Sequence, residues 1–183
     1  MRSFIGVDFP KSLKEQIIEA QNCLKSISIK GRWKYIDNFH LTLKFLGEIE
    51  IESINKIHNI LSEILLNTKG FTLQIDSCAY FKGNGNLRVV YLKPSKNLDK
   101  LFDLYNKIEN AMYELGFEKE KRPYTPHITI AQDVVLKDDF QLFRNFIENK
   151  FFEQIEIDKI ILFDSKEVNK KRIYTPIFTI SLE

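Results

Sequence analysis

Two of the three histidines in this sequence are followed, two positions later, by a threonine. His40 and Thr42 stand in "HLTL", and His127 and Thr129 stand in "HITI". If both stretches are β-strands, side chains alternate between two faces, so each histidine shares a face with its threonine. Imidazole titrates at a pH of about 6.5, so one ring can accept a proton while a second ring donates one.

This combination is what in-line displacement at phosphorus needs. One ring acts as a general base for the attacking oxygen, and the other acts as a general acid for the leaving oxygen. Two threonine hydroxyls can donate hydrogen bonds to the non-bridging phosphate oxygens and hold the group between the rings. The paired motifs therefore predict a site that binds a phosphate group and performs acid–base chemistry on it.

Two other interpretations of these residues are less favoured. Either motif alone fits a histidine at the edge of the core, with threonine as an ordinary strand former. The recurrence of the pair argues against this. Zinc sites usually take three or four protein ligands, and no cysteine or acidic residue completes such a set at motif spacing, so we expect no metal. The third histidine, His58, stands in the helical pattern "INKIHNILSEI" and is expected to be an ordinary helix residue.

The patterns in the rest of the chain predict the elements that must position these motifs. Apolar residues at helical spacing predict helices over residues 11–27, 54–65, 95–117 and 138–148. Alternating or continuous apolar runs between turn residues predict strands over residues 2–9, 31–36, 40–46, 71–81, 86–94, 127–132, 152–157, 159–165 and 172–182.

The order of these elements repeats along the chain. A strand, a helix, a histidine-bearing strand, a helix and closing strands occur over residues 2–81 and again over residues 88–181. We interpret residues 1–183 as a single two-lobed domain of the α+β class, with a pseudo-two-fold relating the lobes. Two antiparallel sheets are expected to flank a central cleft, with helices outside, so that the polar faces of both motif strands line the cleft.

Composition narrows the class of protein. The chain has 183 residues, of which 44% are apolar and 28% charged, which is typical of a globular domain. Its formal net charge of +2 excludes a strongly basic nucleic-acid coat, so any contact with nucleic acid should be local. Cys23 and Cys78 form no CxxC unit, and no signal peptide or membrane-length apolar run is evident. We expect a cytoplasmic protein with no membrane association.

The stretches "RWKYIDNFHLTLKFLGE" and "RPYTPHITIAQD" resemble the two-histidine phosphoesterases. The similarity is strongest to the RNA 2′,3′-cyclic phosphodiesterases, also described as LigT-like 2′-5′ RNA ligases. It covers most of the chain, from the "FIGVDFP" opening to the "Y-x-P-I-F" strand near the end. The resemblance implies a bilobal α+β fold around a metal-free cleft, no cofactor, and hydrolysis of a 2′,3′-cyclic phosphate to a 2′-phosphomonoester.

The resemblance also implies roles for particular residues. The catalytic histidines are His40 and His127, and the phosphate-binding threonines are Thr42 and Thr129. Such a product means that the bond to the 3′ oxygen breaks. We expect His40 to protonate that oxygen and His127 to activate water. The two motifs are nearly symmetric, so the reverse assignment stays open.

Four further residues are candidates for substrate binding. Family members carry an aromatic residue five positions after the first histidine, thought to stack on the terminal base, and here this is Phe45. A core position is the alternative. Where the family often has arginine five positions after the second histidine, this chain has Gln132, which puts the strength of nucleotide binding in doubt. By alternation Lys44 shares the face of His40, or else it is a solvated strand-end lysine, and Tyr124 is expected at the cleft rim.

The expected substrates are RNA ends or small cyclic nucleotides, and no obligate protein partner is inferred. Only RNA can form this cyclic phosphate, because the ring uses the 2′ oxygen. Ligation of 2′-5′ ends is expected as the reverse reaction. The alternatives are a phosphodiesterase of the same kind acting on another cyclic or 2′-5′ nucleotide, and a nucleotide-binding module without catalysis. Two titrating histidines argue against the latter, since binding alone does not need them.

Overall fold

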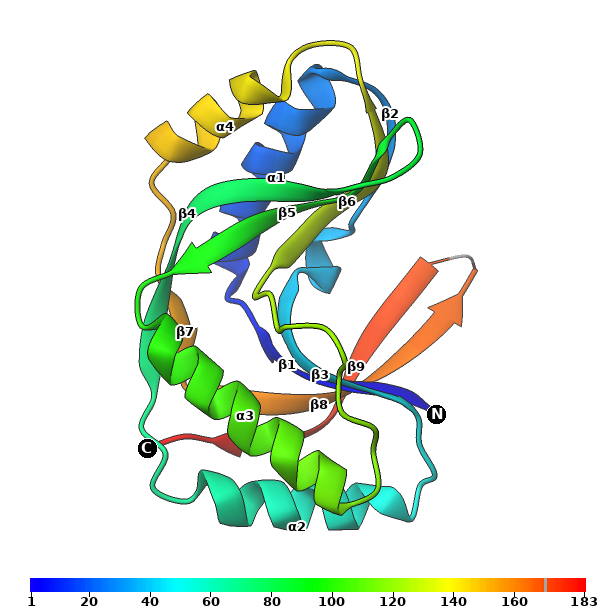
Figure 1. The fold of residues 1–183 in the computed structure, drawn as a ribbon, viewed down its shortest axis with the longest axis vertical. Coiled ribbons are helices and arrows are strands. Elements are labelled where there is room, and N and C mark those ends of the chain that lie inside the picture. Colours follow the sequence, from blue (N-terminus) through cyan, green and yellow to red (C-terminus); the bar gives the residue numbers. More distant parts are fainter. Residues whose placement is uncertain (170) are drawn as a thin grey trace.

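The structure, a computed structural model, describes residues 1–169 and 171–183. Two antiparallel sheets lie one above the other in Figure 1, with α1 (Lys11–Ser26) and α4 (Phe140–Asn149) along the upper sheet. The helices α2 (Ser53–Leu65) and α3 (Leu98–Glu114) lie along the lower sheet. This arrangement confirms the α+β class with two antiparallel sheets and flanking helices.

Each sheet carries one histidine motif: the first motif strand is an edge strand of the lower sheet, and the second lies one strand in from an edge of the upper sheet. The lower sheet has the order β3 (His40–Glu48), β1 (Arg2–Asp8), β8 (Lys159–Val168) and β9 (Lys171–Ser181). The upper sheet has the order β2 (Ser28–Trp33), β6 (Ile128–Leu136), β5 (Leu87–Ser95), β4 (Phe71–Lys82) and β7 (Ile155–Ile157). The short 3-10 helix η1 (Ile36–Asn38) leads into β3.

The predicted elements are all present, with shifted ends. The third helix begins at Leu98 rather than near residue 95, because Lys96 and Asn97 adopt positive φ angles of 56° and 45° that no helix continues. It ends before Gly116, whose φ of +93° suits glycine and allows the Phe117 amide to donate to the carbonyl of Met112 at 3.0 Å. From there the chain crosses from the lower sheet to the upper one (Figure 1).

The core extends through both sheets and all four helices. One cluster of buried apolar residues includes Leu13 of α1, Ile57 of α2, Leu101 of α3 and Phe143 of α4. A second, small cluster lies in the lower sheet and consists of Phe4, Ile161 and Phe163, with Tyr174 packed against it. The lower sheet is therefore apolar on two faces, one against the helices and one on the side of His40.

Each motif strand contains a β-bulge just beyond its threonine. In the β1–β3 pair, Ile5 lies opposite Lys44 while Gly6 lies opposite Thr42, so β3 has one extra residue. The β5–β6 pair repeats this irregularity directly after Thr129. An extra residue shifts the alternation of side chains by one position. Residues five positions after each histidine therefore return to the histidine's face.

The two sequence repeats do not fold as two separate sheets. β4, from the first repeat, pairs with β5 in the upper sheet, whereas β8, from the second repeat, pairs with β1 in the lower sheet. The order β3-β1-β8 in one sheet corresponds to β6-β5-β4 in the other. This is the order that two related units would give if each lent a strand to the other. The duplication itself stays a prediction.

Two simpler properties follow from the described residues. Cys23 and Cys78 are both free thiols. No helix in the described part of the chain has the length and apolar character that crossing a membrane requires.

Candidate active site

The ring of His40 is held by the backbone just before β3. Its Nδ1–H donates to the carbonyl oxygen of Asn38 at 2.7 Å, since a carbonyl oxygen can only accept. The proton is therefore assigned to Nδ1. The lone pair of Nε2 accepts a hydrogen bond from the Thr42 hydroxyl, with Nε2 and Oγ1 3.0 Å apart. A neutral ring with a basic nitrogen beside a hydroxyl can take up a proton, and the protonated ring can give one back.

His127 is held in the same way at the start of the other motif strand. Its Nδ1–H donates to the carbonyl oxygen of Thr125 at 2.7 Å, again two residues earlier. This bond leaves Nε2 as the nitrogen free for chemistry. Thr129 shares the face of His127 by strand alternation, so both motifs present a nitrogen and a hydroxyl together.

Aromatic rings from the same sheet pack on each histidine. These contacts restrict rotation of the imidazoles and shield them from water. The distances between ring centroids run from 4.8 to 6.0 Å, with Phe4 and Tyr174 beside His40, and Tyr91 and Phe81 beside His127.

Burial lowers the pKa of His40 to about 4. Removing the ring from water disfavours its charged form. The hydrogen bond to Asn38 and the carboxylate of Asp8 act in the opposite direction, while the positive charges of Lys34 and His127 lower the pKa further. The effect of His127 is the smallest of these contributions to the pKa of His40.

The bulges bring Phe45 and Gln132 to the histidine faces of their strands. Phe45 is 64% exposed and its ring centroid lies 5.9 Å from that of Phe4, which itself packs on His40. Phe45 is thus a surface aromatic, and the alternative of a core position is wrong; a role in base stacking stays a prediction. Gln132 is half-buried and lies opposite Arg32 of β2. The guanidinium of Arg32 forms an ion pair with Asp133, with Nη2 and Oδ2 2.6 Å apart.

The expectation that Lys44 faces the cleft is wrong, and so is its alternative of a solvated lysine. The bulge turns Lys44 to the buried side of β3, where its side chain is 5% exposed. Its Nζ donates to Oε1 of Glu109 at 2.8 Å and to the carbonyl oxygen of Glu118 at 2.6 Å. The lysine near His40 is Lys34 instead, with Nζ 3.3 Å from the hydroxyl of Tyr174.

Tyr124, expected at the cleft rim, is half-buried and connects two parts of the chain. Its hydroxyl donates to the backbone carbonyl of Thr42 at 2.9 Å, and its ring stacks on Tyr105 with centroids 4.1 Å apart. Burial raises the pKa of this phenol well above its usual range. The tyrosine therefore links the segment before His127 to the strand that carries His40.

Comparison with known proteins decides the family. A family model described as the 2′-5′ RNA ligase superfamily matches residues 32–169, a range that includes both motifs. This chain belongs to the 2′-5′ RNA ligase superfamily. Superfamily relatives named RNA 2′,3′-cyclic phosphodiesterase include one from Thermotoga maritima, 29% identical over all of this chain and 96% of its own length. Another, from Bacillus subtilis, is 32% identical over 75% of this chain and 74% of its own.

The fold agrees with solved structures of the superfamily. The structure of E. coli LigT complexed with 3′-AMP superimposes with a TM-score of 0.81 at 26% identity, covering 99% of this chain and 97% of that chain. The expectation of a LigT-like fold is therefore confirmed.

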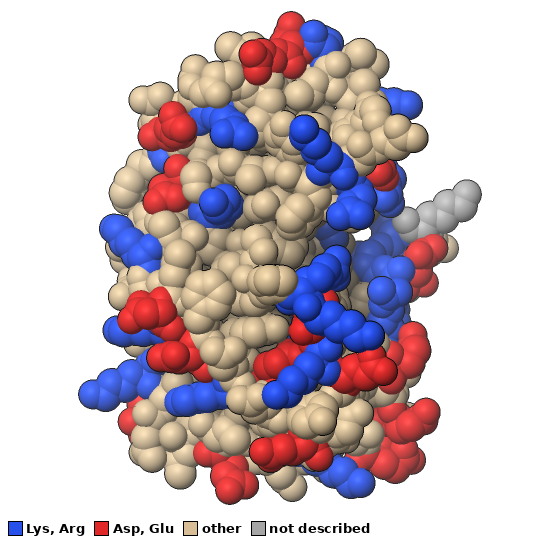
Figure 2. Space-filling view, in the orientation of Figure 1, with Lys and Arg blue, Asp and Glu red and all other residues tan. Residues whose placement is uncertain are grey.

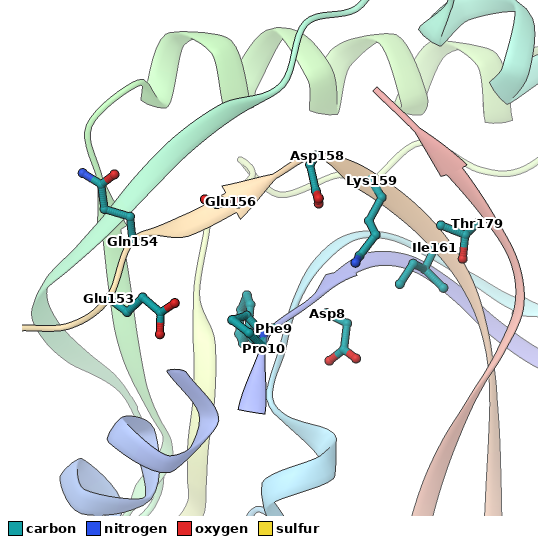
Figure 3. Close-up of a pocket in the computed structure, with 10 residues that line it drawn as sticks. All are labelled: Asp8, Phe9, Pro10, Glu153, Gln154, Glu156, Asp158, Lys159, Ile161 and Thr179. Carbon is teal, nitrogen blue, oxygen red and sulfur yellow. The ribbon is translucent and has the colours of Figure 1, made fainter. Parts of the chain in front are cut away.

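The surface of this superfamily member is hollowed between the upper sheet and the β8–β9 hairpin. Figure 2 shows lysine and arginine side chains along the edges of this hollow. A separate cavity of about 540 Å³ is lined by neither histidine (Figure 3). Its charged lining is mostly acidic and would repel a phosphate; it comprises Asp8, Glu153, Glu156, Asp158 and a single lysine, Lys159.

Several residues of the site were not expected from the sequence. The backbone carbonyls of Asn38 and Thr125 hold the histidines. Every residue type has a backbone carbonyl, so residue identity gives no signal for this role. The only signal in the sequence is the position, two residues before each histidine. Tyr174 lies in the "Y-x-P-I-F" stretch, which carried the family resemblance without a role. Within residues 1–169 and 171–183, no three His, Cys, Asp or Glu side chains are grouped as metal ligands would be.

Proposed function

We propose that this protein hydrolyses 2′,3′-cyclic phosphate ends of RNA or nucleotides to 2′-phosphomonoesters. The observation that carries the proposal is the matched pair of histidines, each with its Nδ1–H bound to a backbone carbonyl. Relatives named RNA 2′,3′-cyclic phosphodiesterase support the substrate class, and the binding of 3′-AMP by E. coli LigT supports a nucleotide site.

In the proposed reaction, water attacks the phosphorus atom of the cyclic diester. One histidine takes a proton from the water at Nε2, the bond between phosphorus and the 3′ oxygen breaks, and the other histidine protonates that oxygen. The products are a 2′-phosphomonoester and a free 3′ hydroxyl. Each ring ends with its proton state exchanged, and solvent restores both.

The hydroxyls of Thr42 and Thr129 would bind the non-bridging oxygens of the phosphate. Before substrate arrives, the Thr42 hydroxyl donates to Nε2 of His40. Turning that hydroxyl to the phosphate frees the nitrogen for proton transfer at the same moment. Phe45 would stack on the terminal base and Gln132 would lie near the phosphate, because both share the faces of the histidines.

The pKa of His40 bears on which histidine is the acid and which is the base. A pKa of about 4 leaves His40 neutral at neutral pH in the free protein, which suits a base. If His40 is the acid, as we expect, the bound phosphate anion must raise this pKa by stabilising the imidazolium. At high concentrations of RNA ends, a 5′ hydroxyl would replace water as the nucleophile: it would lose its proton to one histidine, attack the cyclic phosphate and displace the 3′ oxygen, which takes a proton from the other histidine, leaving a 2′-5′ linkage.

The test is hydrolysis of 2′,3′-cyclic AMP and of an oligonucleotide ending in a cyclic phosphate, with the products separated by chromatography. We expect a 2′-phosphate from both, and a loss of roughly 10²–10⁴-fold in kcat for His40→Ala and for His127→Ala. His58→Ala is the matched control, because His58 is exposed on α2 and packs on Phe178. Binding without turnover would make the protein a nucleotide-binding module, and turnover of other 2′-5′ or cyclic nucleotides alone would change the substrate.

A further inference from the structure

A buried ion pair lies beside the active site and takes no part in the proposed chemistry. Lys44 of β3 and Glu109 of α3 have side chains 5% and 8% exposed, with Nζ and Oε1 2.8 Å apart. The second oxygen of Glu109, Oε2, has no hydrogen-bond partner among the described residues. Removing two charges from water is costly, and apolar residues at such positions are often as stabilising. Stability alone therefore does not explain why the pair is here.

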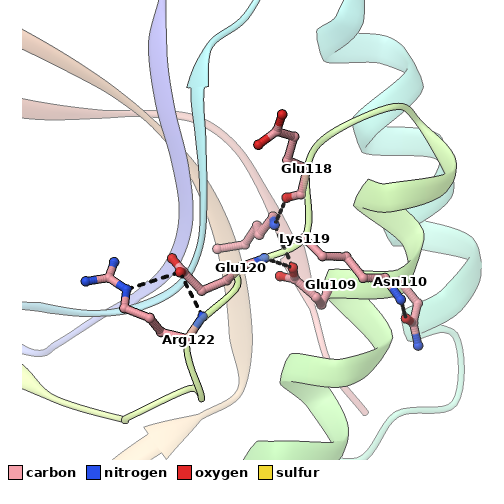
Figure 4. Close-up of polar contacts among 7 residues, drawn as sticks. Glu109, Asn110, Glu118, Lys119, Glu120 and Arg122 are labelled. Atoms are coloured by element: carbon pink, nitrogen blue, oxygen red, sulfur yellow. Dashed lines mark hydrogen bonds and ion pairs between the residues drawn. The ribbon is translucent and has the colours of Figure 1, made fainter.

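The pair holds the segment that leads from α3 to the second motif. Lys44 donates to the carbonyl oxygen of Glu118, and Oε1 of Glu109 accepts the backbone N–H of Glu120 at 2.7 Å. Figure 4 shows these bonds converging on the segment where it leaves the helix. One side chain from β3 and one from α3 thus fix the backbone of residues 118–120.

Tyr124 ties the same segment to the same strand a few residues later. Its hydroxyl bonds to the carbonyl of Thr42, only two positions from Lys44. The next residue is Thr125, whose carbonyl holds Nδ1 of His127. The segment 118–125 is therefore attached at two points to the strand of His40 and ends at the group that orients His127.

We propose that Lys44, Glu109 and Tyr124 are positioning residues that set the placement of His127 relative to His40. They do so by tying segment 118–125 to β3, so that the acid and the base, which belong to different sheets, meet the phosphate at a fixed separation. The kinetic part of this inference rests on the proposed phosphodiesterase function. The structural part, the orientation of His127, does not depend on it.

Two variants separate positioning from folding. Lys44→Met combined with Glu109→Leu removes the bonds to the segment without leaving an unpaired buried charge. Tyr124→Phe removes one hydroxyl and keeps the stack on Tyr105. We expect melting temperatures close to that of the wild type, KM within about twofold, and kcat lower by roughly 10–100-fold, because small displacements of catalytic groups have effects of that size.

Matched controls remove comparable groups that do not touch β3. Tyr105→Phe deletes a hydroxyl from the other ring of the same stack. Lys119→Met deletes an exposed bond between the same segment and α3, in which Nζ donates to Oδ1 of Asn110 at 2.9 Å. Both controls should keep the wild-type kcat. The triple variant of Lys44, Glu109 and Tyr124 should lose less than the product of the separate losses, because all three act on one segment.

Nitrogen NMR of His127 gives a readout that needs no substrate. In the wild type the proton should reside on Nδ1, and in the two test variants a fraction of it should move to Nε2, with no change in the controls. If the wild type turns over cyclic phosphate and the variants match it in kcat and tautomer, the positioning inference is wrong. If the wild type has no activity yet the tautomer shifts, the proposed function fails and the inference stands. If the double variant does not fold, the comparison of Tyr124→Phe with Tyr105→Phe, in kcat and in the tautomer of His127, decides whether the inference holds.

Discussion

At the scale of single residues, each histidine depends on a carbonyl oxygen that lies outside its motif. The carbonyls of Asn38 and Thr125 keep the proton on Nδ1 and leave Nε2 for the reaction. The sequence predicts which residues titrate, because only histidine does so near neutral pH. It does not predict the tautomer or the pKa, because both depend on backbone geometry and on aromatic rings brought in by other strands.

The assignment of acid and base can be tested with sulfur in place of the 3′ bridging oxygen. A thiolate leaves without a proton where an alkoxide needs one, so the variant that lacks the acid should recover much of its rate. With His40 as the expected acid, His40→Ala should be rescued and His127→Ala should stay slow, as measured by single-turnover rates. Rescue of His127→Ala alone would reverse the assignment. Rescue of neither would show that leaving-group protonation does not limit these variants.

The lowered pKa of His40 predicts a pH dependence of stability. The unfolded chain takes up a proton at His40 near pH 6.5, but the folded protein does so only near pH 4, so the folded state binds fewer protons between these values. The free energy of unfolding should therefore fall as the pH drops from 6.5 towards 4. In His40→Gln, denaturant unfolding between pH 7.5 and 5 should show a fall smaller by about 1–2 kcal/mol. Identical slopes in both proteins would show that burial does not shift this pKa.

At the scale of elements, strand alternation predicts the site correctly up to each threonine and then fails. The apolar pattern of "HLTLKFL" indicates a strand, and His40 and Thr42 do share a face. The bulge after Thr42 is not visible in that pattern, so alternation predicts the wrong face for Lys44. A bulge is a property of a strand pair rather than of one strand, and its signal lies in the partner strand at Gly6.

At Gly6 the partner strand β1 leaves no room for a side chain beside β3. A Cβ atom at this position would lie 2.6 Å from the carbonyl oxygen of Leu41, which is backbone and cannot rotate away. Gly6→Ala should displace β3 between His40 and Thr42 and lower both stability and kcat, the latter by roughly 10-fold or more. Gly85→Ala is a control at a site where an added Cβ meets no atom within 4 Å, although its φ of +73° adds local strain. If Gly6→Ala has wild-type kcat, the bulge does not depend on this glycine.

At the scale of the whole molecule, the sequence repeats predict that two motifs meet but not how the sheets are built. β4 of the first repeat pairs with β5 in the upper sheet, and β8 of the second repeat pairs with β1 in the lower sheet. No local sequence pattern predicts this exchange of strands between the sheets. The two motif strands are held differently. The strand that follows His127, β6, pairs with β2 of the first repeat and with β5 of the second, so both halves hold it, whereas β3 is an edge strand that pairs with β1 of its own repeat.

The balance of charge predicts how this protein holds its substrate. The net charge is only +2, and the lysine and arginine side chains that Figure 2 shows beside the hollow cover a short distance, so we expect contact with only a few phosphates. Single-stranded contacts contribute a slope of roughly −0.7 per phosphate to the dependence of log affinity on log salt. We expect a slope of about −1 to −2 for an oligonucleotide ending in a cyclic phosphate, from 1/KM between 50 and 300 mM salt.

Two substitutions at Gln132 test whether this residue contributes to the salt dependence of binding. If Gln132 lies beside the bound phosphate, Gln132→Arg should tighten binding at low salt and steepen the slope by about 0.7, while Gln132→Met should leave the slope unchanged. An unchanged slope in the arginine variant would place Gln132 outside the substrate's path. A wild-type slope steeper than about −4 would instead require an extended track of six or so phosphates. A track of that length would need basic side chains well beyond the edges of the hollow, in a chain where acidic residues nearly balance the basic ones.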